Sequence, residues 1–153
     1  MVKALIVCYS MFGNTEKIAL FLAEGLKTGG VDTSVVKPEE VKFDELSEFD
    51  LLCVGSPVHG WNASKPIKGF LEKLNGVSVL SGKSAFAFDT KGKSRLAGDA
   101  AGKIQRKLEA LGLVAVKPHG SAFVMGREGP LEDGSEAKFK QLGMEIAQSL
   151  QSS

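Results

Sequence analysis

The sequence predicts a doubly wound α/β domain, on two observations. Strand patterns occur five times along the 153 residues, and three of them are short, nearly continuous apolar runs, as in strands that are covered on both faces. Segments whose apolar residues recur at helical spacing lie between these runs. Such alternation of strands and helices is typical of a parallel sheet with helices packed on it. We therefore expect residues 1–153 to form a single domain.

The strands are predicted from apolar runs that are bounded by polar turns. The second run alternates between apolar and polar residues more than the others do, as expected at the edge of a sheet. The fifth strand is expected in two pieces, because Pro118 and Gly120 interrupt it, and such a break fits the margin of a sheet. The predicted strands span residues 2–8, 31–37, 51–55, 85–88, 113–116 and 121–125.

Glycine and proline mark the ends of the predicted helices. The first helix follows the first strand and ends at Gly29, and the second opens near Pro66, because proline is favoured in a first turn. The third helix ends at Gly112, and the last begins at about Ser135. The weaker pattern of residues 43–49 predicts only a short helix.

The composition is that of an ordinary globular protein, with 43% hydrophobic and 24% charged residues. A net charge of +1, with no basic stripe interleaved with aromatic residues, argues against a nucleic-acid partner. No apolar run approaches the roughly 20 residues that span a bilayer, so no membrane insertion is expected. Cys8 and Cys53 lie inside strand patterns and are interpreted as reduced core thiols rather than a disulfide or metal pair, which fits a cytoplasmic protein.

Residues 10–15 directly follow the first strand and lead into the first helix. The first amides of a helix have no internal acceptor, and the helix dipole adds positive potential, so this junction can bind an anion. Ser10, Asn14 and Thr15 add donors, and Gly13 lets a ligand approach the backbone closely. The pattern indicates a site for a phosphate monoester; an ordinary polar turn with an N-cap is the alternative.

Two further segments, residues 56–64 and 89–97, also follow predicted strands. In a doubly wound sheet, ligands bind beyond the carboxyl ends of the strands, at the point where the winding direction reverses. All three segments are richer in glycine and polar residues than the loops expected at the opposite edge. Their convergence favours phosphate binding over an ordinary turn.

Residues 56–64 hold the only tryptophan of the chain, Trp61, between Gly60 and Asn62 rather than within an apolar pattern. Exposed aromatic residues mark binding surfaces, and an indole face suits a flat heterocycle, although a tryptophan can also cover the edge of a sheet. His59 has no serine, cysteine or second histidine placed to form a nucleophile or metal set with it. Local packing of His59 is therefore favoured over catalysis, and no catalytic residue is predicted.

Residues 89–97 hold three cations in five positions, namely Lys91, Lys93 and Arg95. The Gly-Lys-Ser of residues 92–94 belongs to the pattern of a nucleoside-triphosphate P-loop. That pattern also requires a glycine where Ala87 stands, so a P-loop is rejected. A solvated basic turn remains the alternative to a role in ligand binding.

With these segments placed, the chain resembles the flavodoxin family. Residues 9–15 resemble the loop that binds the phosphate of flavin mononucleotide (FMN), and residues 49–57 resemble the strand that leads to the isoalloxazine ring. Residues 129–131, Gly-Pro-Leu before the last helix, also resemble small members of the family. The resemblance covers essentially the whole chain and implies a flavodoxin-like three-layer sandwich, with five parallel strands in the order 2-1-3-4-5.

The resemblance also implies which residues would bind FMN. The phosphate would be held by Ser10, Gly13, Asn14 and Thr15, with the backbone amides of Met11 and Phe12. One side of the ring would be approached by Ser56, Pro57, Val58, His59, Gly60 and Trp61, with His59 or Trp61 flanking the ring. The other edge of the ring would be approached by Asp89, Thr90, Lys91 and Gly92.

Three departures from the family pattern bear on these roles. Phe12 stands where many flavodoxins have a third hydroxyl, so one phosphate donor is missing, and the third loop lacks the tyrosine that usually covers the outer flavin face. The chain is near neutral, whereas typical flavodoxins are acidic. Lys91, Lys93 and Arg95 would favour a negatively charged reduced flavin by Coulomb attraction, which would make it a weaker reductant.

The function implied by the resemblance is that of a low-potential electron-transfer protein between redox partner proteins, a reductase and an acceptor, with a monomer favoured. One alternative is a small FMN-dependent NAD(P)H:quinone oxidoreductase, whose opening loop is nearly as similar, although such enzymes are usually longer. The other alternative is a flavodoxin-like module that no longer binds flavin.

Overall fold

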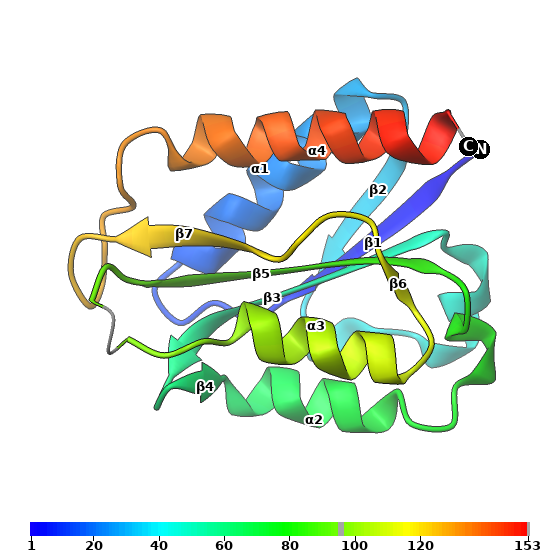
Figure 1. Ribbon diagram of the computed structural model, residues 1–153, viewed down its shortest axis with the longest axis horizontal. Helices are drawn as coiled ribbons and strands as arrows, with labels where there is room; N and C mark the ends of the chain where they lie inside the picture. The colour runs from blue at the N-terminus through cyan, green and yellow to red at the C-terminus, as the bar shows by residue number, and fades with distance from the viewer. Residues whose placement is uncertain (95–96, 153) are drawn as a thin grey trace.

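Parallel strand pairing builds the middle layer of the computed structural model, which describes residues 1–94 and 97–152 (Figure 1). Within these residues the sheet contains seven strands. They are β1 (Lys3–Cys8), β2 (Asp32–Val36), β3 (Leu51–His59), β4 (Asn62–Ala63), β5 (Ser84–Gly92), β6 (Val114–Ala115) and β7 (Gly120–Val124).

The parallel strands follow the order β2-β1-β3-β5, and β6 and β7 both pair with β5, one after the other along its length. β6 and β7 are the two pieces of the predicted fifth strand, and Pro118, which has no amide hydrogen to donate, lies in the break between them. The predicted strand order 2-1-3-4-5 is therefore confirmed. β4 adds a short antiparallel pairing to β3 that the sequence did not predict.

Helices cover both faces of the sheet, with α1 and α4 on one face and α2 and α3 on the other (Figure 1). The four long helices are confirmed, and the short helix predicted over residues 43–49 is a 3₁₀ helix, Phe43–Glu48. Among the described residues, no helix is both long enough and apolar enough to cross a bilayer. The helices are α1 (Asn14–Thr28), α2 (Lys65–Lys73), α3 (Ala101–Ala110) and α4 (Ser135–Gln151), with 3₁₀ helices η1 (Pro38–Glu40), η2 (Phe43–Glu48) and η3 (Ser78–Leu80).

Each face of the sheet has its own hydrophobic core, because successive side chains of a strand point to opposite faces. In β1, Ile6 and Cys8 pack in the core under α1 and α4, whereas Leu5 and Val7 pack in the core under α2 and α3. Cys8 and Cys53 are both buried and free, as predicted. Burial raises the pKa of the Cys8 thiol to about 12, so this thiol stays protonated at neutral pH.

β3 and β5 are longer than predicted, which corrects the boundaries of two segments. Residues 56–59 and 89–92 were expected to be loops, but they continue their strands. Ser56 pairs with Asp89 and Pro57 with Thr90, and β7 pairs with β5 on its other side. Pro57 is tolerated because β1 ends opposite Gly55, so no neighbour on that side requires the missing amide hydrogen.

α1 and α4 touch backbone to backbone through glycine. A Cβ atom at Gly25 of α1 would overlap the carbonyl oxygen of Lys140, and one at Gly143 of α4 would overlap the carbonyl oxygen of Leu22. Interiors are packed too densely to absorb such an overlap without a shift of the backbone. The position of α1 relative to α4 is therefore fixed by residues that have no side chain.

Replacement of Gly143 by alanine should destabilise the protein, because the added methyl group forces the two helices apart. We expect G143A to lower the free energy of unfolding by about 1–3 kcal/mol in urea denaturation. Gly69 of α2 is the matched control, since a Cβ atom there meets nothing within 4 Å. G69A should raise the free energy of unfolding by about 0.5–1 kcal/mol, because alanine is the better helix former. Equal effects of the two substitutions would contradict the close contact.

Candidate functional site

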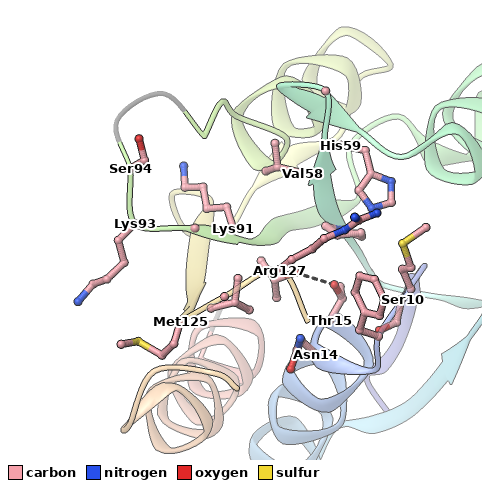
Figure 2. A pocket seen from close by; sticks show the side chains of 18 residues that line it. Ser10, Asn14, Thr15, Val58, His59, Lys91, Lys93, Ser94, Met125 and Arg127 are labelled. Atoms are coloured by element: carbon pink, nitrogen blue, oxygen red, sulfur yellow. Dashed lines mark hydrogen bonds between the residues drawn. The ribbon is translucent and has the colours of Figure 1, made fainter. Parts of the chain in front are cut away.

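A cavity of about 630 Å³ lies at the carboxyl ends of β1, β3, β5 and β7 (Figure 2). Its volume is within the range of small-molecule and cofactor sites. Four segments contribute to its wall, three of them predicted from the sequence. The lining residues are Ser10, Met11, Phe12, Asn14, Thr15, Pro57, Val58, His59, Gly60, Thr90, Lys91, Gly92, Lys93, Ser94, Val124, Met125, Gly126 and Arg127.

The junction between β1 and α1 has the features of an anion site. Gly13 is the N-cap of α1 with φ 91°, and no side chain caps the helix, so the first amides of α1 remain available to a ligand. A Cβ atom at Gly13 would meet nothing within 4 Å, so glycine is needed here for its backbone conformation. The buried hydroxyl of Ser10 has no hydrogen-bond partner among the described residues. An unsatisfied buried donor beside an uncapped helix start fits a phosphate oxygen.

Two other predicted phosphate ligands connect the walls of the cavity. The hydroxyls of Thr15 and Thr90 share a hydrogen bond of 2.8 Å, which joins the start of α1 to β5 (Figure 2). The Asn14 side-chain amide donates to the carbonyl oxygen of Glu128 at 3.1 Å, which joins α1 to the β7–α4 connection. Both side chains line the cavity and also brace it.

Four predicted residues lie outside the lining: Gly13, Ser56, Trp61 and Asp89. Ser56 is buried, and its hydroxyl oxygen accepts a hydrogen bond from the Ser64 amide at 2.9 Å, so it holds the start of α2. Gly13 supports the site through its backbone alone. The contact of the other predicted residues with a flavin remains a prediction.

Trp61 is placed by a hairpin rather than by the cavity. β3 and β4 pair through His59 and Asn62, so Gly60 and Trp61 form a two-residue turn in which both have positive φ, 56° and 64°. The backbone of Trp61 also bridges to Gly98. The side chain is 66% exposed, beside the cavity and not in its wall.

Asp89 caps a helix through one of its two carboxylate oxygens, whereas the other, Oδ1, is buried and has no hydrogen-bond partner among the described residues. Its buried carboxylate accepts hydrogen bonds from the amides of Ala100 and Ala101, at 3.2 and 2.9 Å, where α3 begins. A carboxylate at a helix N-terminus is stabilised by the free amides and by the helix dipole. The sequence did not reveal this role, because the eleven-residue separation from Ala100 is bridged only in the folded chain.

The basic character of the third segment is partly neutralised. Lys93 forms an ion pair with Glu132, and the Lys91 ammonium donates to the carbonyl oxygen of Gly98 at 3.4 Å. Arg95, the third predicted cation, lies outside the described residues. Of the two predicted cations that the structure describes at the cavity wall, Lys91 is therefore the one without a carboxylate partner.

The fourth segment of the wall, residues 124–127, was missed by the sequence analysis. It follows β7 and is held as a tight loop by a hydrogen bond of 2.8 Å from the Met125 amide to the Pro130 carbonyl oxygen. A signal was available, because the predicted strand of residues 121–125 also ends at this edge of the sheet. The segment adds Arg127 to the lining, which then contains, among the residues that the structure describes, three cations and no aspartate or glutamate. The cavity therefore favours an anionic ligand.

The sequence profile of the flavodoxin family matches residues 6–142. The chain belongs to the flavodoxin family. A flavodoxin from Clostridium beijerinckii is 32% identical over 89 residues, which cover 57% of this chain and 63% of that protein. An NAD(P)H dehydrogenase (quinone) from Rhizobium rhizogenes is 30% identical over 103 residues, which cover 54% of this chain and 51% of that protein. The matched regions thus span less than two thirds of either curated relative.

Solved flavodoxin structures share the fold. A flavodoxin from the domain Archaea superposes with a TM-score of 0.83 and 27% identity over 98% of this chain and 99% of its own. Rubredoxin oxygen:oxidoreductase from Desulfovibrio gigas gives a TM-score of 0.82 and 23% identity over 98% of this chain, but over only 36% of its own. The flavodoxin fold therefore occurs both as a complete chain and within a larger one.

Replacement of Asp89 by alanine tests its assignment as a helix cap in this flavodoxin. We expect D89A to lower the free energy of unfolding by about 2 kcal/mol or more, because two buried amides lose their acceptor. D89N keeps one acceptor oxygen and should lose less. Asp32, exposed on β2, is the control, and D32A should change the free energy of unfolding by less than about 0.5 kcal/mol. A value for D89A equal to that for D32A would reject the assignment.

Proposed function

We propose that this protein binds FMN and carries electrons between redox enzymes. Proteins of the flavodoxin family bind FMN, and the observation that carries the proposal here is the unsatisfied buried hydroxyl of Ser10 beside the uncapped start of α1. A phosphate monoester would bind there, with the amides of Met11 and Phe12 and the first amides of α1 as further donors.

The ring of the cofactor would lie against the carboxyl ends of β3 and β5. Residues 57–60 at the end of β3 and residues 90–92 at the end of β5 line the same cavity. The backbone of both segments is fixed by strand pairing, so it would orient the ring and exclude water from one side. The bound FMN supplies the redox chemistry, and the protein supplies the grip, orientation and local charge.

Electron carriage is favoured over the quinone oxidoreductase by the length of the matches. The sequence match to the Clostridium beijerinckii flavodoxin covers 63% of that protein at 32% identity, whereas the match to the quinone dehydrogenase covers 51% of that protein at 30% identity. We propose that the chain works as a single domain, as a monomer in the cytoplasm, with a reductase and an acceptor as its partner proteins.

The test of this function uses the freshly purified protein. We expect it to bind added FMN, shown by quenching of flavin fluorescence and by a yellow product after gel filtration. Stepwise reduction should take up one electron at a time, and NADH with a quinone should not be turned over. Rapid NADH-driven quinone reduction would establish the enzyme instead. Failure to bind FMN would establish the flavin-free module.

Lys91 should raise the reduction potential of the bound flavin, because it keeps a positive charge at the cavity wall. We expect K91Q to lower the potential of the second electron step by about 20–60 mV in an equilibrium redox titration, since roughly 59 mV is a tenfold change in a one-electron equilibrium. Lys27, in the last turn of α1, is the control, and K27Q should leave the potential unchanged. An unchanged or higher potential in K91Q would reject the electrostatic effect.

A further inference from the structure

We propose that Arg127 is a further cofactor-binding residue, whose guanidinium pairs with the phosphate group of FMN. The inference rests on the proposed function and adds a charged ligand to a phosphate site that the sequence builds from neutral donors. It comes from the segment of the wall that no sequence motif indicated.

The loop that carries Arg127 lies against the start of α1. The carbonyl oxygen of Glu128 accepts the hydrogen bond of 3.1 Å from the Asn14 side chain. A Cβ atom at Gly129 would lie 3.0 Å from the side-chain oxygen of Asn14, so the backbone of Gly129 also approaches this residue closely. The two residues that follow Arg127 thus contact the first residue of the helix whose amides would bind the phosphate.

The side chain of Arg127 is directed into the cavity. Figure 2 shows it extending from its loop across the middle of the cavity, in the direction of His59. Arg127 lines the cavity together with Ser10, Asn14 and Thr15, which are the predicted phosphate ligands. A phosphate bound to these residues would share the cavity with the guanidinium.

The positive charge of Arg127 has no counter-charge in the cavity. Lys93 is paired with Glu132, but among the described residues Arg127 forms no ion pair, and no carboxylate lines the cavity. Arg127 is exposed, so its charge is hydrated, and it adds positive potential that attracts an anionic ligand to the cavity. A phosphate monoester carries about −1.5 to −2 charges at pH 7 and matches the planar fork of a guanidinium in a bidentate pair.

The phosphate loop itself is short of donors. Phe12 provides no hydroxyl, and the hydroxyl of Thr15 already shares a hydrogen bond with Thr90. Ser10 and the helix amides are uncharged donors, so they leave the charge of the phosphate without a formal partner. Arg127 would supply that partner from the neighbouring loop between β7 and α4.

The experiment compares FMN with riboflavin, which has the same ring but no phosphate. Fluorescence titrations in phosphate-free buffer would use the full-length wild type and the variants R127Q, R127K and R106Q. We expect the Kd for FMN to rise about 10- to 100-fold in R127Q, the loss typical of a charge-assisted hydrogen bond, and the Kd for riboflavin to stay within about twofold. The Kd of R127K for FMN should lie between those of the wild type and R127Q, because lysine keeps the charge but not the planar fork of the guanidinium.

Arg106 is the matched control, because it is exposed on α3 and does not line the cavity. R106Q should bind both ligands like the wild type, and thermal unfolding would verify that each variant is folded. High salt should narrow the difference between the wild type and R127Q for FMN, since it screens the charge pair.

Three results would overturn the inference while the wild type still binds FMN. An unchanged Kd for FMN in R127Q would mean that Arg127 is not a ligand. Equal losses for FMN and riboflavin would assign Arg127 to the ring. Tighter FMN binding by R127Q would mean that the side chain only fills the cavity. A wild type that binds neither flavin would instead reject the proposed function, and the inference with it.

Discussion

Parallel pairing of β1, β3, β5 and β7 is the constraint on which the rest of this structure depends. Strands that run in one direction deliver all of their carboxyl ends to one edge of the sheet, so four segments that are far apart in the sequence meet there. The strands bury side chains in a core on each face, which fixes their ends against movement. The position of the cavity is thus set by the direction of the strands rather than by any one side chain.

The elements were predictable because they depend on local sequence. Apolar runs, and the glycine or proline beside them, indicated the strands and the bounds of helices such as α1 to within a few residues, whereas the strand order was implied by the resemblance to the family. Gly13 and Ser10 were predictable for the same reason, since a strand, a small turn and a helix start follow each other directly. Features that depend on the pairing of strands were not predictable from the sequence. Trp61 lies outside the cavity lining because the pairing of His59 with Asn62 places it in a hairpin turn. No local sequence pattern predicts that pairing.

The net charge of the cavity wall was harder to predict from the sequence than the positions of the residues that line it. The sequence places Lys91, Lys93 and Arg95 close together, yet Lys93 forms an ion pair with Glu132, which offsets its positive charge. Glu132 lies about forty residues away in the chain, beside the loop that brings Arg127 to the same wall. The electrostatic character of the cavity is therefore set by tertiary contacts of the β7–α4 connection, and counting cations along one loop misjudges it.

The glycine contact between α1 and α4 has a consequence for motion at the cavity. Two helices in direct backbone contact cannot slide or rock past each other as helices separated by flexible side chains do. α1 presents the helix start, and α4 continues from the loop that Asn14 holds. The start of α1 and the β7–α4 connection, which border the proposed phosphate site, are therefore held rigidly to each other. The glycine contact that holds them lies about 16 Å along α1 from the helix start, at 1.5 Å per residue.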